Sequence, residues 1–182
     1  MMDIVVARYK ENVEWTRECP YNVIIYNKGP YLEGSRPRPL IGRESMTFLH
    51  HIVTYWNELA EYTAFVQGNP FDHAPQLSTT LSDFLANPTG FRHLSEVHLV
   101  CDRGGWPHHG GLDVGGIADA IGIHSHSFPF AIGQQFVVSR ERIHSRPIEF
   151  YKRMIEMIEI NPEQVPWVYE RIWELVFTQI HP

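Results

Sequence analysis

The residues most suited to chemistry lie in the stretch "FVQGNPFDHAP", residues 65–75. Residues 62–66 are apolar, β-branched and aromatic, which is typical of a buried strand. A turn rich in Gly and Pro follows and carries Asp72 and His73. Because ligands of open α/β sheets bind beyond the carboxyl ends of strands, the pattern predicts a site in which Asp72 holds a divalent cation or a diphosphate. The alternative is a rigid turn in which Asp72 caps the following segment.

The chain also has a high number of histidines: eleven in total. His124 and His126 share one face of an extended backbone and could bind one metal ion, although no other Cys or His completes a standard zinc spacing. Surface or substrate-contact roles are the alternative. His108 and His109 lie in a Gly-rich loop, where they could donate hydrogen bonds to an anion or simply be exposed.

Basic and acidic side chains near the expected strand and helix ends complete the candidate set. Arg8, Lys28 and Arg43 would suit a substrate that carries phosphate, with solvated surface positions as the equal alternative. Glu170, in "VYERIW", could act as a general base if the last helix brings it to a pocket. On spacing alone, an ion pair between helix turns explains this residue as well.

The elements that must position these residues alternate between strand and helix patterns. Apolar strand-like runs occupy residues 4–9, 21–26, 62–66 and 134–139. Helical periodicity is present from residues 42 to 60 and 148 to 158 and again after Pro166, and Thr80 with Asp83 suggests a capping box for a shorter helix. Residues 102–129 look mostly irregular, as functional or mobile segments often are. We predict one α/β domain, residues 1–182, with a central, mostly parallel sheet flanked by helices.

Composition narrows the class of protein. No apolar run is long enough to cross a bilayer, and the start of the chain is charged too early for a signal peptide, so we expect a cytoplasmic protein without a membrane partner. Cys19 and Cys101 have no metal-type spacing and fit reduced thiols. The formal charge of −6 argues against a large nucleic-acid footprint. A local basic face is still compatible with the cluster Arg140, Arg142, Arg146, Lys152 and Arg153.

Six blocks occur in order along nearly the whole chain: "VVARYKENVEW", "YNKG", "GRESMTFLHHIV", "FVQGNPFDH", "GQQFVVSRERI" and "ERIW". Together they resemble a domain family of unknown function that is found in fungi and some bacteria. That family is similar to compact glycosyltransferases of the Rossmann-like GT-A type. The resemblance implies transfer of a sugar from a nucleotide donor to a small acceptor. Asp72 would then hold the metal or diphosphate with His73 beside it, and Glu170 would be the base.

The same resemblance leaves several points open. We expect Gln67, Asn69 and Arg171, which belong to these blocks, to bind substrate. The usual Asp-x-Asp pair is absent, so dependence on Mn or Mg is an open question. Arginine-containing cyclodipeptide synthases are also similar to this domain. They imply an aminoacyl-tRNA substrate, with Asp72 and Glu170 recognising a guanidinium or amine and residues 140–153 facing outward. A non-catalytic sugar- or phosphate-binding module is the third alternative.

Overall fold

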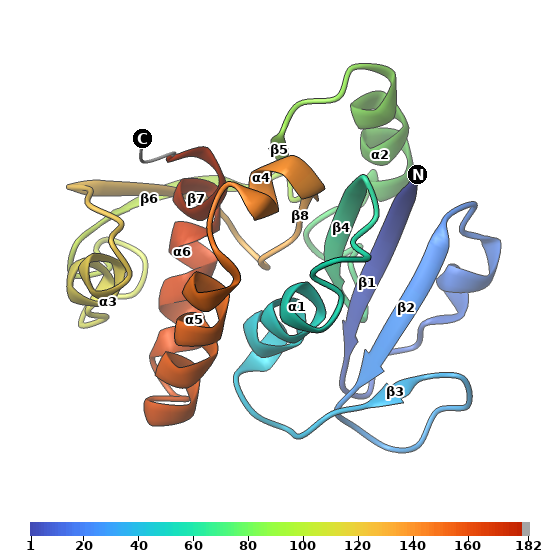
Figure 1. Cartoon of the computed structure of the whole chain (residues 1–182), viewed down its shortest axis with the longest axis horizontal. Helices are drawn as coiled ribbons and strands as arrows, with labels where there is room; N and C mark the ends of the chain where they lie inside the picture. Colours follow the sequence, from blue (N-terminus) through green and yellow to red (C-terminus); the bar gives the residue numbers. More distant parts are fainter. Residues whose placement is uncertain (180–182) are drawn as a thin grey trace.

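A six-stranded sheet forms the centre of the protein, and its strand order is β3-β2-β1-β4-β8-β5. The computed structural model describes residues 1–179 (Figure 1). Strands β1, β2, β3 and β4 are parallel, whereas β8 runs antiparallel to both β4 and β5. The six strands are β1 (Met2–Arg8), β2 (Asn22–Asn27), β3 (Arg36–Pro37), β4 (Tyr62–Gln67), β5 (Phe91–His93) and β8 (Phe136–Ser139). The prediction of a mixed, mostly parallel α/β sheet is confirmed.

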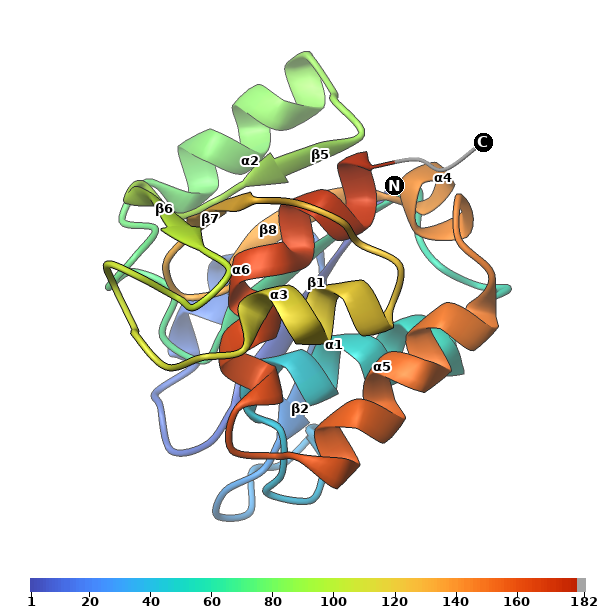
Figure 2. The same cartoon turned by 90° about the vertical axis from the view of Figure 1, so that its left-hand side faces the viewer.

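Both faces of this sheet are covered, because successive side chains of a strand point to opposite faces. On β1, Ile4 and Val6 pack with α2 (Leu77–Ala86) and with Trp15 of the 3-10 helix η1 (Glu14–Glu18). Val5 and Ala7 pack into a larger core on the other face. The longer helices of that core are α1 (Arg43–Thr54), α5 (Ile148–Ile160) and α6 (Val165–Thr178), which lie together in Figure 2.

A second, two-stranded sheet of β6 (His98–Asp102) and β7 (Ser127–Ala131) packs beside α6. The short helices α3 (Val114–Ala120) and α4 (Arg140–His144) complete the fold. The Asp113 side chain accepts a hydrogen bond from the Gly116 backbone N–H and so caps α3. Most of residues 102–129 is irregular, as expected, and α3 is the helical exception that the sequence did not indicate. Seven residues rich in Gly and Ala are too few to show helical periodicity.

Two further details differ from the sequence expectations. Helix α2 begins at Leu77, and the backbone N–H of Thr80 already donates to Gln76 within that helix, so Thr80 is not an N-cap. Helix α1 ends at Thr54, earlier than its apolar stripe suggested. Among the described residues, no helix combines the length and apolar character that a transmembrane span requires.

One histidine of α1 is part of the core. His51 is 1% exposed, and its Nδ1 lies 3.1 Å from the Tyr26 hydroxyl oxygen. Burial, with a smaller contribution from the nearby positive charge of Arg36, lowers the pKa of His51 from 6.5 to about 3. The imidazole is therefore neutral in the folded protein, whereas it titrates near its ordinary pKa once the chain unfolds.

This difference predicts how stability depends on pH. Between about pH 6.5 and pH 3 the unfolded chain binds the extra proton, so the free energy of unfolding falls as the pH falls. At pH 5 the contribution of His51 is a loss of about 2 kcal/mol relative to neutral pH. In urea unfolding at pH 7 and pH 5, His51→Asn should lose this part of the pH dependence. Equal pH dependence in the wild type and the variant would contradict the assignment.

Candidate functional site

A cleft of about 450 Å³ opens at the carboxyl edge of the sheet, beyond the end of β4. Gln67, the last residue of β4, forms part of its wall. The remaining polar side chains come from four different segments of the chain: Arg43, His73, His108, His109, Glu170 and Arg171. Apolar surface is contributed by Trp167, Phe130, Leu99 and Ile132. The position agrees with the general location of ligands in open α/β sheets.

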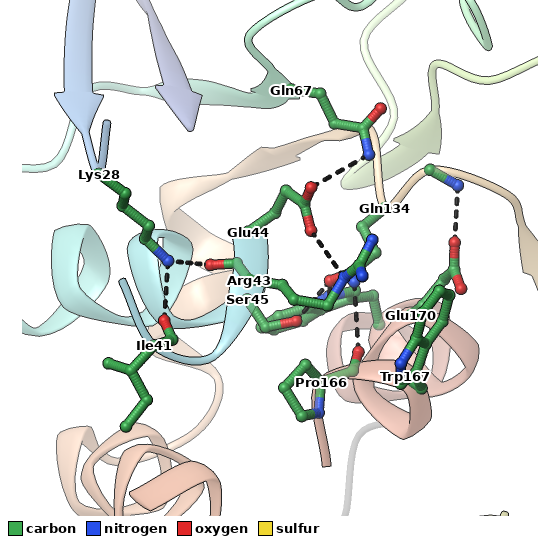
Figure 3. A network of polar contacts seen from close by, with 12 residues as sticks. Lys28, Ile41, Arg43, Glu44, Ser45, Gln67, Gln134, Pro166, Trp167 and Glu170 are labelled. Carbon is green, nitrogen blue, oxygen red and sulfur yellow. Dashed lines mark hydrogen bonds and ion pairs between the residues drawn. The ribbon is translucent and has the colours of Figure 1, made fainter. Parts of the chain in front are cut away.

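The turn between β7 and β8, residues 132–135, forms one side of this cleft, and we call it the GQQ turn. Its Gly133 and Gln134 are both left-handed, with φ of 86° and 54°. The side chain of Gln134 accepts hydrogen bonds from the Ser45 hydroxyl and from Trp173 Nε1 at 3.3 Å, and donates to the Pro166 carbonyl at 3.2 Å (Figure 3). The GQQ turn is thereby held by both α1 and α6.

Glu170 and Arg171 come from the second turn of α6 and are 9% and 4% exposed. One oxygen of Glu170 accepts a hydrogen bond of 2.7 Å from the Gly133 backbone N–H (Figure 3). The other oxygen pairs with Arg171 Nη1 at 3.1 Å, and the same guanidinium donates to the Trp167 carbonyl. The Nε of Arg171 has no hydrogen-bond partner among the described residues. The carboxylate is thus occupied by protein groups.

Two side chains of the cleft, Arg43 and His109, contact the ring of Trp167. The guanidinium of Arg43 lies 4.1 Å from the centre of the Trp167 ring, and the His109 ring lies 5.3 Å from it. Arg43 Nε also pairs with Glu44 at 3.6 Å, and Glu44 accepts a hydrogen bond of 3.3 Å from the Gln67 side chain. This chain of contacts connects the start of α1 with the end of β4 and the start of α6 (Figure 3).

His73 lies against the GQQ turn. A Cβ atom on Gly133 would come within 2.4 Å of His73 Cδ2, so only glycine leaves room for the ring. The backbone of His73 is fixed, since its N–H donates to Pro70 and its carbonyl accepts from Glu96. Its half-buried imidazole makes no hydrogen bond to another residue of the described chain.

Other residues singled out from the sequence lie elsewhere. Asp72 is exposed and does not line the cleft, although its neighbour His73 does; Asn69, half-buried in the same turn, is not a lining residue either. Arg8 and Lys28 line a neighbouring cavity of about 290 Å³, which shares Arg43 with the cleft. Arg8 is held there by the Asn27 side chain at 2.7 Å.

The histidine pair and the basic segment are also outside the cleft. His124 pairs with Asp119 at 2.9 Å, and His126 is exposed. Arg146 is buried and donates to the Val176 and Gln179 carbonyls at 2.7 and 2.8 Å. The expectation that residues 140–153 face outward is therefore wrong at Arg146. The free carbonyls at the end of α6 require donors, and this side chain supplies them.

The donor set of the cleft does not fit a divalent cation. Within residues 1–179, no three His, Cys, Asp or Glu side chains come together so that they could hold a metal ion. Glu170 is the one carboxylate among the lining residues, and both of its oxygens already contact protein donors. Hard divalent cations require several free oxygen ligands. Cys19 and Cys101 are free thiols and contribute no metal site.

Sequence reasoning missed two residues that build the site. Trp167 lies outside the apolar stripe of Val168, Ile172 and Val176 in the last helix, and Gln134 reads as the start of a strand. A signal for Gln134 existed: the glycine before two polar residues, ahead of an apolar strand, is typical of a turn with left-handed residues.

The hydrogen bonds of Gln134 lead to a prediction about stability, tested with leucine, which has nearly the same volume as glutamine. Gln134→Leu should lower the free energy of unfolding by about 3 kcal/mol or more, because Ser45, Trp173 and Pro166 would lose their buried partner. Urea unfolding at neutral pH measures the effect. Gln76→Leu is the matched control, since Gln76 is exposed and its side chain makes no capping bond. Equal losses in the two variants would contradict the role assigned to the turn.

Comparison with known proteins places this site within a family. No curated protein and no solved structure matches the chain. Residues 4–89 and 128–181 match the model of a family described as "Protein of unknown function (DUF3431)". The matched ranges contain Arg43, Gln67, His73, Glu170 and Arg171, whereas His108 and His109 lie between them. Because the match extends over more than half of the sequence, the chain belongs to the DUF3431 family of proteins of unknown function.

Proposed function

We propose that the protein is a transferase whose donor substrate carries phosphate. In its finer form, the proposal is transfer of a sugar from a nucleotide sugar to a small acceptor. The observation that supports it is the composition of the cleft: Arg43, Arg171 and three histidines surround a cavity at the carboxyl edge of the sheet. Glu170 is the single carboxylate among the lining residues and is already paired with Arg171, while Arg43 pairs with Glu44 beside the cleft. Such a cleft favours an anionic ligand.

Each part of the donor has a matching surface in this proposal. Arg171, whose side chain lines the cleft, binds phosphate oxygens. Arg43 binds them from the opposite wall, and His108 and His109 close the outer side. The face of Trp167 packs against a sugar or a base, as aromatic rings in ligand sites commonly do. A volume of about 450 Å³ suits a ligand of this size.

The chemical step requires a base and a stabilised leaving group. A ring nitrogen of His73 takes the proton from the acceptor hydroxyl as the acceptor oxygen bonds to the anomeric carbon. The bond from that carbon to the phosphate oxygen breaks, and the negative charge on the departing phosphate is stabilised by Arg43 and Arg171. The role of base, which the sequence suggested for Glu170, passes to His73 in this proposal. Glu170 instead positions Gly133 and Arg171.

The alternative with an aminoacyl-tRNA substrate has less support. It needs an outward basic surface beside the cleft, but Arg146 is buried and none of residues 140–153 lines the cleft. Acidic side chains are also interleaved with the basic ones along α4 and α5, including Glu141, Glu149 and Glu156.

Calorimetry with UDP, GDP and their glucose and mannose conjugates, with and without Mn²⁺, tests binding. We expect at least one of these to bind, and Arg43→Gln to weaken its affinity by about 10-fold or more, because a charge-assisted hydrogen bond is lost. Arg17→Gln, an exposed site outside the cleft, serves as the control and should bind as the wild type does. Binding by none of the nucleotides would refute the proposed donor.

Turnover separates a transferase from a binding module. His73→Gln should keep the affinity for the nucleotide but lower the rate of transfer by about 100-fold or more, as expected when a general base is removed. The measurement is release of free nucleoside diphosphate in the presence of a panel of small hydroxyl acceptors. A wild-type protein that binds the donor tightly but releases no diphosphate with any acceptor would instead indicate a non-catalytic module.

A further inference from the structure

Lys28 is not a wall residue of the cleft, yet its ammonium is directed at the backbone that carries Arg43. It follows the end of β2, and its Nζ donates to the Ile41 carbonyl at 2.9 Å and to the Arg43 carbonyl (Figure 3). These two carbonyls flank Gly42. The backbone N–H of Lys28 is itself fixed by a hydrogen bond of 2.8 Å to the Arg8 carbonyl at the end of β1.

The backbone held by Lys28 is in an unusual conformation. Gly42 and Arg43 both have left-handed dihedrals, with φ of 67° and 49°. For Arg43 this conformation is unfavourable by about 1 kcal/mol or more, so other contacts must maintain it. Gly42 admits no side chain, since a Cβ atom would lie 2.5 Å from Ile158 Cγ2. This left-handed backbone brings the Ile41 and Arg43 carbonyls together. The Lys28 ammonium binds both carbonyls and so stabilises the same backbone conformation.

The direction of the Arg43 side chain depends on this turn. Its guanidinium lies 4.1 Å from the centre of the Trp167 ring, and its Nε lies 3.6 Å from Glu44. Its side chain is about half exposed, so few packing contacts fix it apart from the Trp167 ring. A relaxed backbone at Arg43 would redirect the first bond of the side chain and move the guanidinium off the ring.

We propose that Lys28 is a positioning residue: its ammonium holds the left-handed turn at Gly42 and Arg43, and so places the Arg43 guanidinium on the wall of the cleft against Trp167. The position of Arg43 follows from the contacts alone. The effect of Lys28 on ligand affinity rests on the proposed function, because that effect requires an anionic ligand in the cleft.

The charge on Lys28 makes this arrangement sensitive to pH. Burial lowers the pKa of Lys28 to about 8; the negative charge of Glu44 opposes this, and the positive charges of Arg38 and Arg43 add to it. The other ionisable groups that line the same cavity are Arg8, Tyr9 and Glu11. Below that pKa the ammonium makes charge-assisted bonds to both carbonyls. Above it, the neutral amine makes bonds that are roughly half as strong.

The first experiment follows the ring of Trp167 without any ligand. The protein is labelled with 5-fluorotryptophan, and the ¹⁹F signal of Trp167 among the five tryptophans is identified with Trp167→Phe. A His109→Gln background removes the imidazole that also contacts this ring. We expect the Trp167 signal to shift with a midpoint near pH 8. In Lys28→Met it should differ from its low-pH position in the parent protein at every pH and show no such midpoint.

Lys10→Met is the matched control, because it removes a nearby lysine charge from an exposed side chain that does not contact the Arg43 backbone. Its Trp167 signal should titrate as in the parent protein. An unchanged Trp167 signal in Lys28→Met would overturn the proposal. If that variant fails to fold, Lys28→Gln, which removes the charge but keeps a polar side chain, replaces it, and an unchanged Trp167 signal in Lys28→Gln overturns the proposal.

The second experiment measures the affinity for inorganic pyrophosphate by calorimetry at pH 7. Lys28→Met should bind about 10-fold more weakly than the wild type, and Lys10→Met should bind with nearly unchanged affinity. Equal affinities in the wild type and Lys28→Met, with pyrophosphate bound, would overturn the link from Lys28 to the ligand. A wild-type protein that does not bind pyrophosphate but shows the Trp167 transition would refute the anionic-ligand function and leave the positioning role established.

Discussion

The conformation of the GQQ turn is the constraint on which both the fold and the cleft depend. Gln134 is a non-glycine residue in a left-handed conformation, which is unfavourable unless surrounding contacts enforce it. Those contacts come from the Ser45 side chain on α1 and from Trp173 and Pro166 on α6. The next residue, Gln135, donates to the Pro70 carbonyl at 3.0 Å and so connects the turn to the segment after β4. The same contacts that pack the helices onto the sheet therefore shape the wall of the cleft.

The direction of β8 explains why a turn so far along the chain reaches this edge. An antiparallel strand begins where its parallel neighbours end, and the first residue of β8, Phe136, pairs with Phe65 near the end of β4. The GQQ turn is thus delivered beside the ends of β1, β2 and β4. Had β8 been parallel, its polar turn would lie at the opposite edge, and Glu170 would have no Gly133 N–H to bind.

Sequence patterns predicted the parts of the fold that depend on local order. Apolar runs located β1, β2 and β4, and the rule that ligands bind beyond strand ends led to His73. Gln67 was expected from the family resemblance, and Arg43 from the basic residues near strand and helix ends. Asp72 shows the limit of that rule. The N–H groups of His73 and Ala74 both donate to Pro70, so this segment is a tight turn in which neighbouring side chains diverge. His73 faces the GQQ turn, whereas Asp72 faces solvent.

The parts that could not be predicted are those created by packing between distant segments. Nothing in the local sequence of Trp167 indicates that Arg43 will lie over its ring, and nothing near Glu170 indicates that Gly133 will donate to it. The direction of β8 was equally inaccessible, because an apolar run is compatible with either direction. The overall charge of −6 likewise gave no sign of the locally cationic cleft, because net charge averages over the whole surface.

The antiparallel entry of β8 has a further consequence for how the molecule forms. Contacts between residues near positions 45, 70, 134 and 170 have high sequence separation, and chains dominated by such contacts fold slowly because large loops must close first. During synthesis, the strands near the amino terminus can pair before the last helix has emerged from the ribosome, but the cleft cannot exist at that stage. The cleft is thus completed late, because Trp167, Glu170 and Arg171 reach it only when α6 packs onto the rest of the fold.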